Sequence, residues 1–531
     1  MGLRKALSIL SKSSPYSVST LRKECASDPQ QKLKDYLYIT PPIQIEFEKA
    51  LLEAGENDII CLCGSSGDGK TEILTQLHKE LSHKVAFHLD ATHSRSQHKS
   101  AIDCLNDEFE KFKSNSKPLA IGINIGMLQK FMKLGDDRHN DIKILFIEYF
   151  KNRHTKGFKA GNICFYDFEC YPRLEFSENK ITSEFVSKFL QKLTAKSENN
   201  PFWQHYLEDV RSSSSIISKN FEILSLELFQ KKLIELFGIA RLLEEQFLTP
   251  RNFVDFIFQI LTRENSEGII GNLFSEFDNE YCQCFKEFDP NRFRSPALDS
   301  FYLEFSTNTL NKKFQEDVQR LVSMTGVELS SQGLTRCSYL LGETGLIPCI
   351  ANLTKNSYLQ QALEYYLCLI DLYGKDQLTS EDEEKYLRVI EDILITAAFE
   401  YANRSLPTKV DGYIVSRSIN DYAVCNKASV QADLNWVEKN KLVSIDTLPI
   451  PLIINNKDTY VFLIDLKTIY QAIQIFNGYR PNRQNLEVIA KFDELVSHIV
   501  RRTIDAESMK IISNDKIAVI NKNRKRFTVE V

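Results

Sequence analysis

Eight consecutive residues near the amino end combine glycines, a lysine and a threonine at a spacing suited to phosphate chemistry. They are Gly64, Ser65, Ser66, Gly67, Asp68, Gly69, Lys70 and Thr71. This G-x-x-x-x-G-K-[ST] pattern is the P-loop signature, in which backbone N–H groups surround phosphates and the lysine reaches the β- and γ-phosphates. The threonine hydroxyl of such a loop binds Mg²⁺. The pattern therefore predicts that these eight residues bind ATP or GTP, with Thr71 as a metal ligand.

The flanking sequence has the order of elements that such a loop requires. An apolar run, Ile59–Cys63, precedes the loop and predicts a strand, and apolar residues at helical spacing follow it up to Ser82. The run Val85–Leu89 then predicts a second strand. A helix that begins at the loop would point its N–H groups and the positive end of its dipole at the phosphates. A glycine-rich turn without a ligand is the alternative interpretation.

A further predicted strand, 119–124, ends at Asn124. Ligands of open parallel sheets lie beyond the carboxyl ends of the strands, so Asn124 is a candidate to sense the γ-phosphate or the attacking water. An asparagine at this point is equally suited to turn the chain or to cap the following helix. The sequence leaves both interpretations open.

The acid that would hold Mg²⁺ through water has two candidates. The predicted strand 162–168 ends near Asp167, and Glu169 follows as a candidate to orient the attacking water. Asp90 ends a strand of the same general shape. We favour Asp167, because the metal-side acid usually lies further along the chain than the first strand after the loop.

A second helical region follows the predicted α/β core, and it contains one candidate for nucleotide sensing. Thr249 is a suitable N-cap and Pro250 a suitable first helical residue, which places Arg251 in the first turn. Arg251 resembles the sensor-2 arginine of AAA+ proteins, which reaches the γ-phosphate from a lid helix. An exposed, solvated arginine is the alternative interpretation.

The composition is that of a large globular protein. The chain has 531 residues, 43% of them hydrophobic, and a formal net charge of -5, which disfavours extensive binding of nucleic acid by its whole surface. Its 12 cysteines lack the paired spacing of a zinc site and are interpreted as reduced structural thiols. Neither a signal peptide nor a membrane span is predicted, so a soluble cytoplasmic protein is expected.

The predicted fold class is α/β, a P-loop NTPase (AAA+-like) parallel sheet with a helical lid, followed by a helical region and a smaller mixed α/β domain. The predicted parts are an N-terminal segment 1–42, a nucleotide-binding core 43–220, a lid 221–265, a helical domain 266–406 and a C-terminal domain 407–531. The turn Asn521–Arg526, with Arg480, Arg483, Arg501 and Arg502, is a candidate basic surface for DNA or a partner; a solvated hairpin tip is the alternative.

Four segments together resemble the DptF (DndF) family of bacterial phosphorothioation-dependent DNA restriction. They are Leu7–Tyr16, Cys63–Lys70, His88–His93 and Lys117–Leu128. The resemblance, which is strongest over residues 1 to about 130, implies an ATPase that uses ATP and Mg²⁺ and works with two companion proteins, one of them a helicase-like motor. It implies defence against DNA that lacks phosphorothioate marks, with DNA contacted through partners or a local basic surface. Self-association is compatible with this role.

Two other functions fit the same loop. In the first, bound ATP stabilises a protein complex and is hardly hydrolysed. In the second, a P-loop kinase phosphorylates a small molecule or a nucleic-acid end, which requires an acceptor pocket with its own base.

Overall fold

The fold is that of a computed structural model of the whole chain. The structure describes residues 2–16, 28–89, 100–177, 180–212, 215–292, 296–354, 357–419, 422–442, 444–481, 486–513, 516–523 and 526–530. Contacts divide the chain into two compact units. Unit 1 comprises Met1–Glu175, Thr182–Phe237 and Phe247–Thr354, and unit 2 comprises Phe176–Ile181, Gly238–Gln246 and Lys355–Val531.

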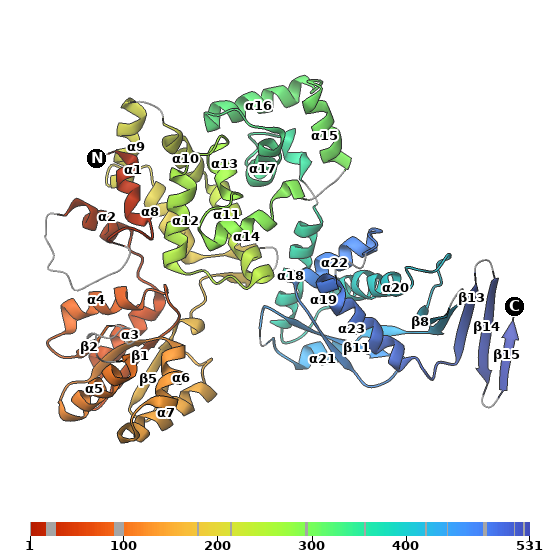
Figure 1. Cartoon of the computed structure of the whole chain (residues 1–531), viewed down its shortest axis with the longest axis horizontal. Coiled ribbons are helices and arrows are strands. Elements are labelled where there is room, and N and C mark those ends of the chain that lie inside the picture. The colour runs from red at the N-terminus through yellow and green to blue at the C-terminus, as the bar shows by residue number, and fades with distance from the viewer. Residues whose placement is uncertain are drawn as a thin grey trace. The chain divides into compact units, whose positions relative to one another are not determined.

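A five-stranded, mostly parallel sheet forms the centre of the α/β part of unit 1 (Figure 1). Its strands follow the order β2 (Ala86–His88), β3 (Leu119–Ile123), β1 (Ile59–Cys63), β5 (Ile163–Asp167) and β4 (Phe158–Ala160). The first four are parallel, and β4 is antiparallel to β5. All five residues of β1 are buried, as expected for a central strand covered on both faces. The predicted α/β class is confirmed, although β4 makes the sheet mixed.

Helices cover both faces of this sheet, as the alternation of side chains along β1 requires. Ile60 and Leu62 pack in one cluster with residues of α3 (Pro42–Glu53) and α4 (Lys70–Leu81). Cys61 and Cys63 point to the other face. The helices that cover that face are α5 (Ala101–Ser114), α6 (Ile125–Leu134) and α7 (Asn140–Lys151). Both thiols are buried, and burial raises the pKa of Cys61, which fits their predicted structural role.

The remainder of unit 1 is almost entirely helical. Its α-helices are α1 (Leu3–Leu7), α2 (Pro29–Leu37), α8 (Glu184–Thr194), α9 (Pro201–Ser212), α10 (Ile216–Leu224), the first part of α11 (Glu227–Glu244), α12 (Pro250–Thr262), α13 (Gly268–Leu273), α14 (Glu280–Glu287), α15 (Pro296–Ser306), α16 (Lys312–Thr325) and α17 (Ser331–Leu341). The predicted lid 221–265 corresponds to the end of α10 together with α11 and α12.

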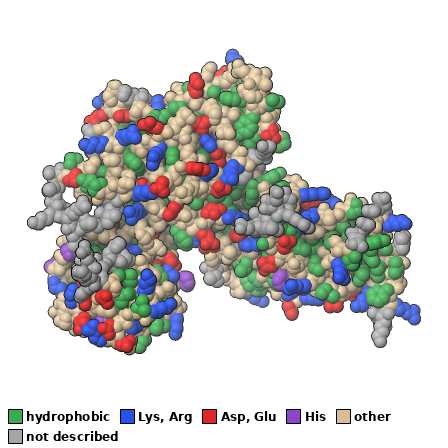
Figure 2. Space-filling model, in the orientation of Figure 1, with side chains coloured by type: hydrophobic (Ala, Val, Ile, Leu, Met, Phe, Trp, Pro, Cys, Tyr) green, Lys and Arg blue, Asp and Glu red, His purple; other side chains and the backbone are tan. Residues whose placement is uncertain are grey.

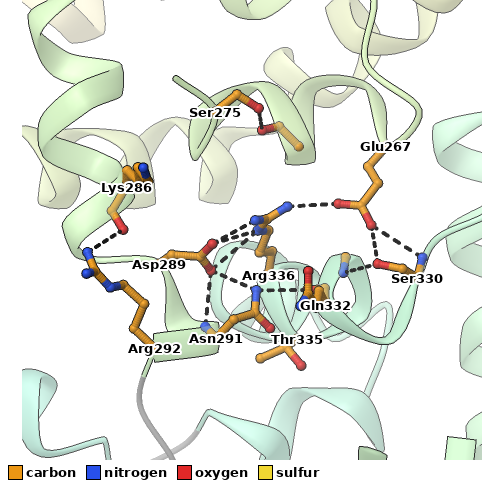
Figure 3. Close-up of polar contacts among 12 residues, drawn as sticks. Glu267, Ser275, Lys286, Asp289, Asn291, Arg292, Ser330, Gln332, Thr335 and Arg336 are labelled. Carbon is orange, nitrogen blue, oxygen red and sulfur yellow. Dashed lines mark hydrogen bonds and ion pairs between the residues drawn. The ribbon is translucent and has the colours of Figure 1, made fainter. Parts of the chain in front are cut away.

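A buried ion-pair cluster joins three of these helical segments (Figure 3). Arg336 of α17 pairs with Glu267, which precedes α13, at 2.9 Å, and with Asp289, which precedes the short helix Pro290–Arg292, at 2.7 Å. All three side chains are at most 16% exposed, so removal of one partner would leave a buried charge uncompensated. The cluster therefore fixes the packing of α17 against α13.

Unit 2 contains helices and two antiparallel sheets. Its helices are α18 (Tyr358–Tyr373), α19 (Ser380–Leu387), a π-helical segment (Arg388–Ile395), α20 (Thr396–Ala402), α21 (Leu434–Lys439), α22 (Leu466–Phe476) and α23 (Leu486–Arg502). One sheet has the order β10 (Val430–Ala432), β11 (Leu448–Ile454) and β12 (Tyr460–Ile464). The other has the order β15 (Arg526–Glu530), β14 (Lys516–Asn523), β13 (Ser508–Ser513), β9 (Tyr422–Lys427) and β8 (Tyr413–Ile419). A short hairpin pairs β6 (Glu175–Ser177) with β7 (Lys180–Thr182), and its segment Phe176–Ile181 belongs to unit 2.

β11 and β12 form a hairpin, because they pair antiparallel on either side of Asn455. Asn455 and Asn456 adopt φ values of 49° and 54°, a left-handed conformation that asparagine tolerates better than most residues. The predicted helical domain 266–406 is shared between the units: residues 266–354 belong to unit 1 and 357–406 to unit 2. None of the helices within the described ranges is long and apolar enough to cross a membrane.

Candidate phosphate-binding site

The glycine-rich loop joins the carboxyl end of β1 to the start of α4, as the sequence predicts. A Cβ built on Gly64 would lie 2.8 Å from Cδ2 of Phe168, so only glycine allows this close approach. Gly69 has a φ of 99° and occupies the N-cap position of α4, where it offers no side-chain cap to the helix. The first-turn N–H groups of α4 therefore remain suited to an anion.

The ammonium group of Lys70 lies against the carbonyl oxygens of the same loop. Its Nζ donates to the carbonyl oxygen of Gly64 at 3.1 Å and to that of Ser65 at 2.7 Å. Lys70 and Thr71 are half-buried in the first turn of α4, whereas Ser65 and Ser66 are exposed. These two contacts hold the lysine over the loop, and a phosphate oxygen would compete with the carbonyl oxygens because charge-assisted hydrogen bonds are stronger.

Asp68 faces inward and is fixed by Arg173, a residue that the sequence prediction missed. The Asp68 carboxylate accepts from the Ser65 N–H at 2.6 Å and from Nη1 of Arg173 at 3.1 Å. Nη2 of Arg173 donates to the Asp68 carbonyl oxygen at 2.9 Å, and Nη1 also donates to the Leu248 carbonyl oxygen at 3.2 Å. Arg173 therefore connects the glycine-rich loop to the segment that leads into α12.

The side chain of Arg173 is largely shielded from solvent. Its side chain is 14% exposed, and its guanidinium carbon lies 5.2 Å from the centre of the Phe168 ring. Burial lowers the pKa of Arg173, and the neighbouring carboxylate of Asp68 opposes that shift. The position Tyr171-Pro172-Arg173 carries no motif, so no sequence signal distinguished this arginine from a solvated one.

Arg251 lies beside the glycine-rich loop, although it is 180 positions away from Thr71, the last residue of that loop, along the chain. A Cβ built on Gly67 would lie 3.5 Å from Cβ of Arg251 and 3.6 Å from Oγ1 of Thr249. Thr249 is the N-cap residue of α12 and Pro250 its first residue, as predicted, but the threonine hydroxyl makes no capping hydrogen bond. The amino end of a second helix therefore meets the loop, with the exposed Arg251 in its first turn.

Asn124 follows β3 directly and caps α6. Its Oδ1 accepts from the Met127 N–H at 2.6 Å, so the capping interpretation is confirmed. Ile123 is in register with Cys63, which places Asn124 next to the start of the glycine-rich loop at the same edge of the sheet. A capping role and a position beside the loop are thus combined in one residue.

The cap and the predicted sensing role of Asn124 can be separated by substitution. We expect Asn124→Ala to lower the free energy of unfolding by about 1 kcal/mol, and Asn124→Ser to retain most of that stability, since serine caps helices nearly as well as asparagine. Chemical denaturation of both variants measures this difference. Loss of nucleotide turnover in the stable Asn124→Ser variant would then indicate that the amide itself is required.

Asp167 occupies the end of β5, in register with Cys63 of β1. Its carboxylate is buried and accepts from the Tyr149 hydroxyl at 2.5 Å, from Nε of Arg153 at 3.0 Å and from the Glu169 N–H at 3.0 Å. Glu169, which is about half exposed, pairs with Nη2 of the same arginine. Arg153 therefore holds both predicted catalytic acids.

The electrostatics of this cluster favour a charged Arg153 and a protonated Tyr149. Burial opposes the charge on Arg153, but its hydrogen bond to Asp167 raises the pKa of Arg153. Burial, followed by the neighbouring Cys63 thiol and the hydrogen bond to Asp167, raises the pKa of Tyr149, so the phenol stays a proton donor. Asp90, the alternative acid, lies outside the described residues, and the choice between the two acids stays open.

The ends of three adjacent strands therefore gather the predicted site at one edge of the sheet. β3 contributes Asn124, β1 the glycine-rich loop and β5 Asp167, while Arg251 reaches the loop from α12. The glycines of the loop and the start of α4, which has no side-chain cap, fit a triphosphate. Lys70, Thr71 and Asp167 are the groups that would hold the triphosphate and Mg²⁺. Within the described part of the chain, no group of three or more His, Cys, Asp or Glu side chains is arranged as a metal site of its own.

The predicted basic surface is described only in part. Arg483, Arg524 and Lys525 lie outside the described residues. Arg502 donates to the Asp458 carbonyl oxygen, and its guanidinium carbon lies 5.7 Å from the Tyr460 ring centre, so it has a structural role as well as a charge.

Comparison of the chain with protein-family models, with curated proteins and with solved structures finds no match.

Proposed function

We propose that this chain is a P-loop ATPase with an AAA+-like core and lid. The proposal rests on one observation: the G-x-x-x-x-G-K-[ST] loop lies between a buried parallel strand and an uncapped helix, with Lys70 over its carbonyl oxygens and Arg251 beside it. In this proposal Lys70 neutralises the β- and γ-phosphates and Thr71 binds Mg²⁺. Asp167 positions a water of the metal, and Glu169 orients the attacking water.

The ion pairs of Arg153 give this mechanism a definite first step. We expect Glu169 to polarise a water once its carboxylate leaves Arg153, because the guanidinium engages Oε1 of that carboxylate. The released Arg153 guanidinium would be free to approach the negative charge of the phosphates. Asn124 and Arg251 would then report the presence or loss of the γ-phosphate to α6 and α12.

ATP hydrolysis can drive mechanical or assembly work only if a partner protein binds the states before and after hydrolysis with different affinities. On the resemblance to the DptF (DndF) family, we propose that the chain serves a phosphorothioation-dependent restriction system in the cytoplasm, with a helicase-like motor among its companions. The net charge of -5 supports a subunit that reaches DNA through partners or a local basic surface. A pull-down from the source cell that recovers no helicase-like companion would count against this wider role.

Incubation with γ-labelled ATP tests the reaction class directly. The ATPase proposal predicts that the label appears as free phosphate, and Mg²⁺ removal by a chelator should abolish its release. A label on a carbon-containing acceptor would instead establish a kinase. Parallel reactions with GTP would define the base preference.

The Glu169→Gln variant distinguishes an enzyme that hydrolyses ATP from a scaffold that binds ATP and hardly hydrolyses it. We expect this variant to bind ATP and to release phosphate about a hundredfold more slowly, because the group that orients water is neutralised while the phosphate cradle is intact. Phosphate release and nucleotide binding are measured on the same preparation, with Glu175→Gln, at an exposed glutamate of strand β6, as a matched control. Unchanged turnover in Glu169→Gln would exclude Glu169 from the mechanism.

A further inference from the structure

The strand β15 forms one edge of the five-stranded sheet of unit 2 (Figure 1). It pairs with β14 on one side, from Asn523↔Arg526 to Val519↔Glu530, and within the described ranges no strand pairs with its other side. Its five residues, Arg526–Glu530, are all exposed. An edge strand of this kind offers unpaired N–H and C=O groups to another strand.

The side chains of β15 do not protect this edge. Phe527 is 63% and Val529 is 60% exposed, and both point to the same face because side chains alternate along a strand. Figure 2 shows hydrophobic side chains over the region of this sheet. Natural edge strands are commonly blocked by a proline, a central charge or a bulge, whereas the centre of β15 is Phe-Thr-Val.

The sequence of β15 is complementary to itself when two copies run antiparallel. If Thr528 lies at the twofold axis, Arg526 of each copy faces Glu530 of the other, and Phe527 faces Val529. Opposite charges, an aromatic with a β-branched residue, and paired threonines are all favourable cross-strand neighbours. Parallel pairing in register would instead place like charges side by side.

We infer that β15 is a self-association surface, through which two copies of this chain join their five-stranded sheets edge to edge. The pairing is isologous, and it closes at two copies because each sheet presents one β15 edge. Main-chain hydrogen bonds supply the affinity and the two Arg526–Glu530 pairs set the register. The contact spans few residues, so the dimer is concentration-dependent. This surface is independent of the nucleotide site.

Charge reversal tests the register. In sedimentation velocity over a concentration series, the full chain is expected to dimerise, and Arg526→Glu or Glu530→Arg to weaken the dimer about tenfold, since each reversal makes two attractive pairs repulsive. The double reversal should restore the dimer. A chain that stays monomeric, single reversals without effect, or a double variant no stronger than the singles would overturn the inference.

A cysteine scan gives a second, independent readout. Thr528→Cys should form a disulfide-linked dimer on mild oxidation, because directly opposed residues have Cα atoms about 4.5–5.5 Å apart, within disulfide reach. Val529→Cys is the matched control, since its two copies would lie about 7–8 Å apart along a diagonal. Equal cross-linking of the two variants, or none in Thr528→Cys beyond the parent chain, would contradict pairing centred on Thr528. Neither result depends on nucleotide binding, so Lys70→Ala should leave both unchanged.

Discussion

Replacement of Lys70 by alanine is expected to lower ATP turnover by about a thousandfold and to weaken ATP binding measurably. The Lys70 ammonium lies against the carbonyl oxygens of Gly64 and Ser65, at the mouth of the loop that would receive the β- and γ-phosphates. Loss of one preorganised charge at a developing negative centre commonly costs about 10²–10³-fold in rate, and Lys70 would also contribute to ground-state binding. Phosphate release and titration calorimetry measure the two effects.

Lys111→Ala is a matched control for this substitution. Lys111 is an exposed lysine of α5 that pairs with Glu108, and its removal changes the net charge equally without touching the loop. Turnover by Lys70→Ala at the level of Lys111→Ala would remove the basis of the ATPase proposal. Lys70→Arg refines the test, because a planar guanidinium keeps the charge but cannot occupy the same point between two carbonyl oxygens.

Replacement of Arg173 by alanine is expected to destabilise unit 1 by about 3–5 kcal/mol. The substitution leaves the Asp68 carboxylate buried without its cation, and the Asp68 and Leu248 carbonyl oxygens each lose a donor. The glycine-rich loop and the segment before α12 lose their shared contact, so ATP binding should weaken as well. Thermal and chemical unfolding of the full chain, followed by ATP titration of the folded variant, measure both effects.

Two comparisons make the Arg173 result interpretable. Arg4→Ala removes an arginine whose pair with Glu264 is exposed on both sides, and it should change stability by about 0.5 kcal/mol or less. In the double variant Asp68→Ala with Arg173→Ala, the decrease in the free energy of unfolding should be smaller than the sum of the decreases in the two single variants, because neither charge is left buried without its partner. Strictly additive losses would show that Arg173 and Asp68 do not stabilise one another.

Local sequence patterns were sufficient for the elements that form the candidate site. The run Ile59–Cys63 and the spacing of apolar residues after Thr71 predicted β1 and α4, and Thr249-Pro250 predicted the start of α12. These signals are local: a strand buried on both faces is continuously apolar, and a helix start has a preferred N-cap and first residue. The antiparallel strand β4 was missed, since three residues of mixed character carry little periodicity.

The partners of the site residues could not be predicted in the same way. Arg173 lies 105 positions from Asp68, and no spacing rule connects them. Arg153 is only 14 positions from Asp167, but it follows α7 in an irregular segment, where an arginine is ordinarily solvated. Such pairs are determined by the packing of α7 on the sheet, which is a tertiary property. The sequence singled out Asp167 and Glu169 as candidates without indicating that one arginine contacts both.

The path of the chain through the two units limits how the protein can be dissected. The end of α11 and the segment Phe176–Ile181 belong to unit 2, although both lie far upstream of Lys355. Arg241 of α11 forms a paired contact with Asp446, and a Cβ on Gly238 would clash with Ile181. A cut at residue 355 would therefore separate Phe176–Ile181 and Gly238–Gln246 from the rest of unit 2, whereas unit 1 would keep all of its segments. Expression of residues 355–531 alone is expected to yield insoluble material, so functional work on unit 2 calls for the uncut chain.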